Sequence, residues 1–131
     1  MPAKDVPSDK PVLDKLGVKP GMRTAVIGID DAPFLTELRA RADVTIGEAP
    51  SGTEMAFLGV DGPDGMDQLH ELRDAIARDG AVWVVNPRGL KGFNSNDVMK
   101  LGLQTGMVDV KIARFSETHT ATKFVIRKAD R

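Results

Sequence analysis

The sequence predicts an α/β fold in which a largely parallel sheet lies between helices on both of its faces. Three consecutive segments indicate this: an amphipathic helical pattern over residues 66–79, the glycine Gly80, and the apolar run Ala81–Val85 (AVWVV). A strand without polar alternation is typical of a parallel strand that is buried on both faces. Ligands of such folds bind beyond the carboxyl ends of the strands, and we expect a functional site there.

Composition narrows the class of protein. The chain has 131 residues, enough for one domain with its own core, and a net charge of −1 with no basic stripe, so we expect no nucleic-acid partner. No apolar run approaches the ~20 residues of a membrane span, and the N-terminus lacks the apolar segment of a signal peptide, so we expect no membrane partner. The sequence has no cysteine, which excludes disulfides and Cys-based zinc sites and suits a cytoplasmic location.

The N-terminal part is expected to hold a tail and the first strand. Residues 1–11 are rich in Pro, Lys and Asp and predict a flexible tail, followed by a single domain over residues 12–131. Residues 12–16 can form one helical turn that Gly17 ends, and residues 23–29 (RTAVIGI) predict a strand.

A helix is expected directly after this strand. Asp30 and Asp31 are candidates for its N-cap, and a proline two residues later suits the first helical turn. Phe34, Leu35 and Leu38 recur at the spacing of one helical face, so they predict its buried side.

The second and third strands are predicted at residues 43–48 and 54–60. The link between them is shorter than the dozen or more residues of a usual parallel crossover. The two strands are therefore either antiparallel neighbours or lie apart, on either side of the first strand. We favour the second arrangement, because a segment as apolar as MAFLGV suits a central position.

The second half of the chain predicts two helices and three strands. The helix at 66–79 is expected to end at Gly80, as its left-handed terminator, and to be followed by the strand at 81–85 and a loop at 88–93. The next helix is expected to be capped by Asn94 or Ser95 and to end at Gly106. Two strands at 107–115 and 122–127 are then expected, joined as a hairpin by residues 116–121. Trp83 lies within the apolar strand and is expected in the core.

The end of the chain resembles a known group of proteins. A helix, an Asp-Gly pair, a strand, a further helix and the hairpin Gly106–Arg127 (GMVDVKIARFSETHTATKFVIR) resemble the C-terminal half of class I S-adenosylmethionine-dependent methyltransferases. Together with Leu16–Ile27 (LGVKPGMRTAVI) and Gly80–Arg88 (GAVWVVNPR), the hairpin also resembles a small bacterial family of unknown function. That resemblance covers about residues 12–131.

The resemblance implies a Rossmann-like, three-layer α/β/α sandwich. Its sheet would be a reduced methyltransferase-like sheet of about six strands, with a C-terminal antiparallel hairpin. Three residues depart from the small family's pattern: Asn86, Arg88 and His119, the last standing where a tryptophan is usual.

The loop after the first strand argues against a bound cofactor. Cofactor-binding methyltransferases carry several glycines there, whereas residues 28–33 (GIDDAP) contain one. Ile29 adds bulk, and Pro33 removes an N–H donor. The two aspartates would repel a phosphate and occupy the helix N–H groups that bind it. We expect no cofactor, and S-adenosylmethionine is the alternative that the resemblance leaves open.

Four residues are candidates for a cofactor site: Gly28, Asp30, Asp31 and Glu48. Glu48 closes the second strand 20 residues after Gly28, where an acid of Rossmann-like folds accepts hydrogen bonds from ribose hydroxyls. The competing interpretations are plain ones: helix capping by the two aspartates and a solvated strand end for Glu48.

Three residues at the end of the apolar strand are candidates for ligand binding: Asn86, Arg88 and Lys91. The two basic residues flank a glycine-containing loop and could bind a small anion. The competing interpretations are a strand-ending turn at Asn86 and a solvated loop after it.

No catalytic or metal site is predicted. His70 and His119 are expected on a solvent-facing helix side and at a hairpin tip, without a metal-ligand partner at i+3 or i+4. The favoured hypothesis is a reduced methyltransferase-like domain, non-catalytic, that binds a small molecule or another protein. The alternatives are an active small S-adenosylmethionine-dependent methyltransferase and a structural homo-oligomer, such as a homodimer paired through an edge strand of the hairpin.

Overall fold

The computed structural model describes residues 11–89 and 92–131. Pro11 is the N-cap of the first helix, and the rest of the predicted tail lies outside the described residues. The elements in chain order are α1 (Val12–Leu16), β1 (Arg23–Ile27), α2 (Ala32–Arg41), β2 (Asp43–Ile46), β3 (Thr53–Gly59), η2 (Pro63–Asp67, a 3₁₀ helix), α3 (Gln68–Ala75), β4 (Ile76–Pro87), α4 (Ser95–Leu103), β5 (Met107–Arg114), β6 (His119–Ile126) and η3 (Lys128–Asp130). None of the helices in these described ranges is long and apolar enough to cross a membrane.

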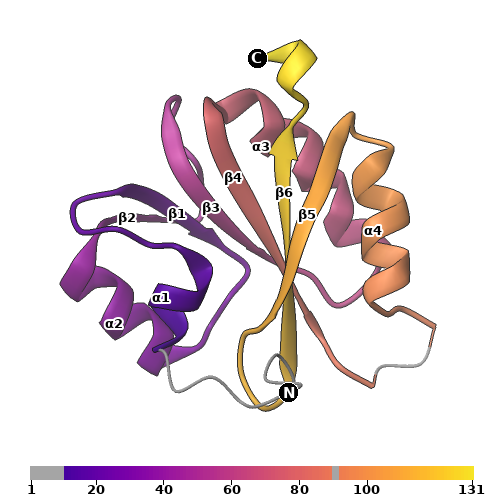
Figure 1. Ribbon diagram of the computed structural model, residues 1–131. Helices are drawn as coiled ribbons and strands as arrows, with labels where there is room; N and C mark the ends of the chain where they lie inside the picture. The colour runs from indigo at the N-terminus through magenta and orange to yellow at the C-terminus, as the bar shows by residue number, and fades with distance from the viewer. Residues whose placement is uncertain (1–10, 90–91) are drawn as a thin grey trace, which may run out of the picture.

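The six strands form one mixed sheet in the order β2-β1-β3-β4-β6-β5 (Figure 1). β1 pairs in parallel with both β2 and β3, and β3 pairs in parallel with β4. β6 runs antiparallel to both β4 and β5, which closes the sheet with a hairpin. The favoured placement of the second and third strands on either side of the first is therefore confirmed.

A short helix-free crossover makes this placement feasible. The chain leaves β2 at Gly47, whose N–H donates to the carbonyl of Val26 at 2.8 Å, and it enters β3 after Gly52. Both glycines have a positive φ, 89° and 87°, which lets the chain reverse direction at each end of the crossover. Ala49, between them, packs against the core on the face of the sheet that α3 and α4 cover.

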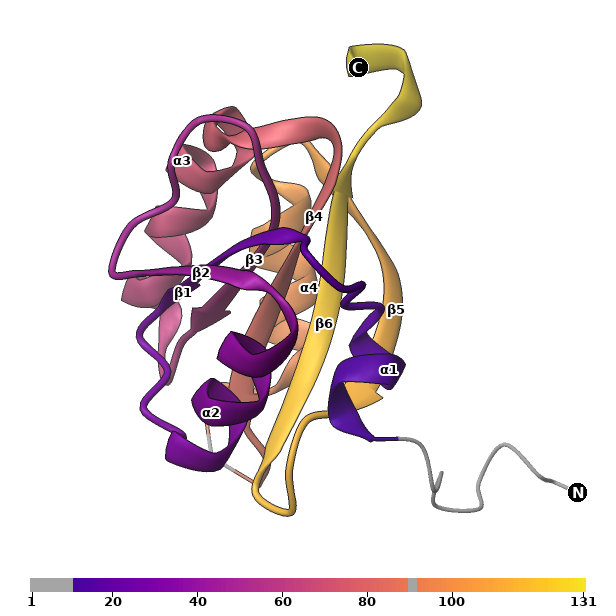
Figure 2. The same ribbon diagram turned by 90° about the vertical axis from the view of Figure 1, so that its left-hand side faces the viewer.

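Helices cover both faces of the sheet, as expected. Two clusters of buried side chains fill the two interfaces, one under α1 and α2 and the other under α3 and α4. Figure 2 shows α1 and α3 on opposite sides of the sheet. β4 contributes to both clusters by alternation: Val82 and Val84 face one, and Trp83 and Val85 face the other. The prediction of a strand buried on both faces is confirmed.

The predicted helix over residues 66–79 is wrong at both ends. A 3₁₀ helix comes first, α3 is short, and the backbone is extended from Ile76 because this residue already pairs with β3. Gly80 is not a left-handed terminator, since it lies inside β4. A Cβ atom on Gly80 would lie 2.8 Å from the carbonyl oxygen of Glu54, so the glycine is required by close approach of two backbones.

A buried hydrogen bond ties α1 to the centre of the sheet. Trp83 donates from Nε1 to the carbonyl oxygen of Leu16 at 3.0 Å. Gly17 ends the helix with φ 81°, as predicted, and Leu13 and Leu16 are buried against the sheet. Trp83 is therefore a core residue whose polar atom has a structural partner.

Candidate functional site

A cleft of about 590 Å³ opens where β1, β3 and β4 end. Its lining comes from four segments: 28–31 after β1, 59–61 at the end of β3, Val85 with Pro87 in β4, and Phe115, Ser116 and Thr118 in the turn between β5 and β6 together with His119 at the start of β6. The start of α2 and this turn lie at the same end of the molecule (Figure 1). This is the edge of the sheet at which the fold class predicts a ligand.

The floor of the cleft is formed by two strands in very close contact. Gly28 has φ 74°, and a Cβ atom there would lie 2.9 Å from the carbonyl oxygen of Gly59. A Cβ atom on Gly59 would in turn lie 2.9 Å from Cγ1 of Ile29. The side chain of Ile29 therefore rests on Gly59, between the ends of β1 and β3.

The aspartates after β1 differ in their roles. Asp31 is the N-cap of α2, and its Oδ1 accepts the N–H of Phe34 at 3.0 Å, which confirms the capping prediction for this residue. Pro33 has no N–H to offer. Among the residues that the structure describes, Asp30 makes no side-chain hydrogen bond, and its side chain is exposed beside the cleft. The first turn of α2 consequently has few N–H groups left for a ligand.

The cleft is acidic. Asp30, Asp31 and Asp61 line it, and no lysine or arginine of the described residues does. Two unit charges of opposite sign about 4 Å apart attract by ~1 kcal/mol in water and ~4 kcal/mol at the effective dielectric of a protein surface. A positively charged ligand is therefore favoured in this cleft over a negatively charged one.

The turn between β5 and β6 forms a polar wall. His119 is half-buried and lines the cleft, and it is the first residue of β6 rather than a residue of the hairpin tip, where it was expected. The reason is that β6 begins at His119, which pairs with Pro87 of β4, rather than at Thr122. The Nδ1 atom of His119 lies 2.8 Å from Oγ1 of Thr118.

Aromatic packing holds this wall against α2. The ring centroids of Phe115 and Phe34 are 4.7 Å apart, and those of Phe34 and Phe57 are 5.2 Å apart in an edge-to-face arrangement. The rings thus connect the turn of the hairpin to the first turn of α2 and to β3.

The structure brings together three of the residues predicted from the sequence, Gly28, Asp30 and Asp31. Glu48 is exposed beyond β2 and does not line the cleft. Contact between these residues and a cofactor stays a prediction.

The predicted ligand-binding residues lie elsewhere. Asn86 is buried in β4 with its side chain on the α3 and α4 face, because side chains alternate along a strand, and its Nδ2 donates to the carbonyl of Pro87 at 3.3 Å. Arg88 is exposed and does not line the cleft, and Lys91 lies outside the described residues.

Sequence reasoning missed Asp61 and the residues of the β5–β6 turn. Asp61 could have been found, since it follows the carboxyl end of a predicted central strand. The position of His119 at the cleft depends on the pairing of β6 with β4, and no local sequence motif indicates this pairing. The described parts of the chain hold no group of three or more His, Asp or Glu side chains that could bind a metal ion.

Comparison with known proteins identifies the fold. No family model and no curated protein matches the sequence. A TehB-like S-adenosylmethionine-dependent methyltransferase from Corynebacterium glutamicum superposes with a TM-score of 0.54 at 11% identity, over 88% of this chain and 85% of that one. A methyltransferase-like structure from Thermoplasma acidophilum superposes with a TM-score of 0.58 at 12% identity, over 94% of this chain and 77% of that one. The chain has a class I methyltransferase-like fold.

Proteins of similar fold do not all catalyse the same reaction. A structure described as a pericyclic reaction enzyme superposes with a TM-score of 0.56 at 10% identity, over 90% of this chain. This chain spans 47% of that protein's length. At these identities the comparisons establish the methyltransferase-like fold, and the function has to be argued from the cleft.

Proposed function

We propose that this chain is a small-molecule binding module whose cleft holds a ligand without transferring a methyl group. The observation that carries the proposal is the position of the cleft at the point where the strand order reverses, between β1 and β3. Its volume of about 590 Å³ is in the range of ligand pockets, roughly 300–1,000 Å³.

The charge of the cleft supports a cationic ligand. Asp30 and Asp61 are exposed beside it, Asp31 is half-buried, and their carboxylates attract a positive charge. The same carboxylates repel phosphate groups, so nucleotides are poor candidates. The apolar side chains of Ile29 and Phe115 offer contact to the uncharged part of such a ligand.

The loop after β1 supports binding without methyl transfer. Its single glycine is used for the contact with Gly59, and Ile29 lies over that contact. Asp31 takes the N–H of Phe34 at 3.0 Å. The loop therefore does not offer the open, glycine-rich backbone with which methyltransferases approach their cofactor.

An active S-adenosylmethionine-dependent methyltransferase is the second candidate, and two observations favour it. The fold is shared with such enzymes, and His119 lines the cleft, where an imidazole could accept a proton from a methyl acceptor. The three carboxylates suit the positive charges of S-adenosylmethionine, whereas the loop after β1 does not suit its close approach. The cofactor would supply the methyl group when bound.

Calorimetry with S-adenosylmethionine, S-adenosylhomocysteine and adenosine triphosphate tests the proposal. S-adenosylmethionine carries a methyl group and a positive charge on sulfur that S-adenosylhomocysteine lacks, so we expect it to bind more tightly and the triphosphate not to bind. Asp30→Asn and Asp61→Asn should each weaken binding about five-fold, equivalent to ~1 kcal/mol for one exposed charge pair.

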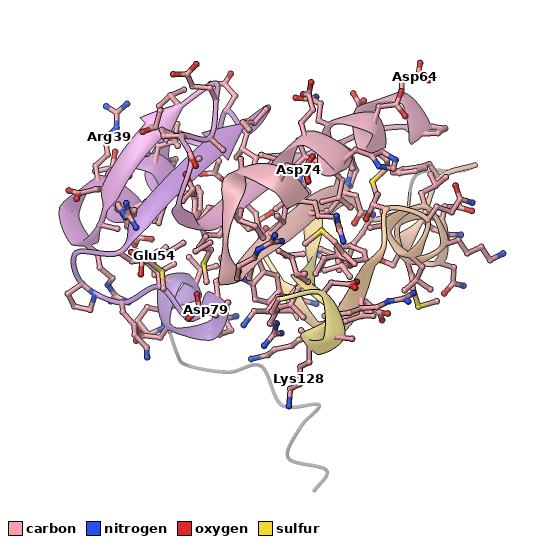
Figure 3. All side chains as sticks on the ribbon, turned by 90° about the horizontal axis from the view of Figure 1, so that it is seen from above. Arg39, Glu54, Asp64, Asp74, Asp79 and Lys128 are labelled. Atoms are coloured by element: carbon pink, nitrogen blue, oxygen red, sulfur yellow. The ribbon has the colours of Figure 1, made fainter. Side chains whose placement is uncertain are left out.

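Asp79→Asn is the matched control. Asp79 is exposed near the start of β4 (Figure 3), whereas the cleft lies at the other end of this strand, at Val85 and Pro87, so this change should leave binding unaltered. Absence of S-adenosylmethionine binding at millimolar concentration would contradict the proposal. Formation of S-adenosylhomocysteine with any methyl acceptor would replace it by the second candidate.

A further inference from the structure

Two hydroxyls of the turn between β5 and β6 and the imidazole at the start of β6 form a hydrogen-bonded chain. Oγ of Ser116 lies 3.3 Å from Oγ1 of Thr118, and that Oγ1 lies 2.8 Å from Nδ1 of His119. All three residues line the cleft. A chain of this kind at a cleft fixes which atoms donate and which accept toward a ligand.

The backbone of the turn sets the direction of this chain. Ser116 Oγ accepts the N–H of Thr118 at 3.3 Å and the N–H of His119 at 3.1 Å, which uses both of its lone pairs. Ser116 therefore donates its own proton to Oγ1 of Thr118. Oγ1 of Thr118 then has its own proton available for Nδ1 of His119, 2.8 Å away, and this arrangement places the proton of the neutral imidazole on Nε2.

The Nε2–H group is the polar part of His119 that remains for a ligand, because Thr118 takes Nδ1. An N–H donor pairs with an oxygen acceptor. The first turn of α2 gives that oxygen few competing donors, since Asp31 takes the N–H of Phe34 and its carboxylate repels a negatively charged oxygen.

We propose that His119 recognises an oxygen acceptor of the ligand through Nε2–H, and that Thr118 and Ser116 are the positioning residues that hold it in this tautomer. This inference rests on the proposed function and extends it. The ligand carries a carbonyl or carboxylate oxygen at the His119 side of the cleft, in addition to a positive charge near the aspartates.

Nitrogen NMR tests the tautomer in the ligand-free protein. The chain has two histidines, so a His70→Ala variant assigns the signals. At alkaline pH, where the imidazole is neutral, we expect His119 to carry its proton on Nε2. Thr118→Val keeps the shape of the side chain and should give a mixture of tautomers, whereas Thr118→Ser should preserve the wild-type one. A proton on Nδ1 in the wild type, or no change in Thr118→Val, would overturn the proposal.

Calorimetry with S-adenosylmethionine and its decarboxylated form tests the ligand class, because the two cations differ in one carboxylate. His119→Ala should weaken binding of S-adenosylmethionine roughly ten-fold or more, the effect of one hydrogen bond to a charged group, and leave the decarboxylated form unaffected. Equal losses for both compounds, or none, would overturn this inference and leave the proposed function standing. Failure of the wild type to bind either compound would remove the proposed function and this inference with it.

Discussion

At the scale of single residues, the contact between Gly28 and Gly59 determines the shape of the cleft floor. β1 and β3 end here with their backbones closer than any side chain would permit. Ile29 covers the contact, so the floor is apolar while the rim is acidic. The same residues explain why a glycine after β1 does not by itself indicate a cofactor loop: this one is required by packing between strands.

Replacing Gly59 by alanine should destabilise the protein by roughly 1–3 kcal/mol, the usual cost of forcing an extra carbon into a packed site. The new Cβ atom would meet Cγ1 of Ile29 at 2.9 Å, and the backbone of Gly28 even more closely. Thermal unfolding measures the effect. Gly62→Ala is the control, because Gly62 has an extended backbone, φ −171°, and open space around it. A Gly59→Ala protein as stable as the control would show that the ends of the two strands separate easily.

At the scale of elements, features that a local motif determines were predicted from the sequence, whereas features that depend on long-range strand pairing were not. The cap of α4 was predicted because a local motif carries it: Asn94 accepts the N–H of Asn96 at 2.9 Å. The end of α3 was not predicted, because Ile76 leaves the helix to pair with β3. For the same reason Asp31 was found beside the cleft and His119 was not, since the position of His119 depends on the pairing of β6 with β4.

α1 shows how one long-range bond can hold an element. Trp83→Phe keeps the ring in the core and removes the 3.0 Å hydrogen bond to the carbonyl of Leu16. Leaving this acceptor without its partner should cost about 1–3 kcal/mol and speed hydrogen exchange in α1 more than in β4. Lys111→Ala is the comparison, because it removes an exposed 3.4 Å bond to the carbonyl of Lys15 and should have little effect. Equal exchange in wild type and Trp83→Phe would mean that apolar packing alone holds α1.

At the scale of the whole molecule, the sheet has two edge strands, β2 and β5. On β5, Val110 and Ile112 are 54% and 58% exposed, which is unusual for large apolar side chains. The register of β5 against β6 shifts between Asp109 and Lys111, so a regular edge is left only after this bulge. An apolar edge of this kind favours pairing with another strand.

A homodimer, one of the alternatives that the sequence leaves open, would use this edge, with β5 of two copies extending the sheet. Light scattering at high protein concentration should then show a dimer, and Ile112→Lys should shift it toward the monomer, because like charges would meet across the pairing. Ile46→Lys is the matched control: Ile46 is 48% exposed on the opposite edge, and its replacement should leave the dimer intact. A wild-type monomer at every concentration would contradict the pairing. A dimer that Ile46→Lys dissociates and Ile112→Lys does not would move the interface to β2, at the other edge of the sheet.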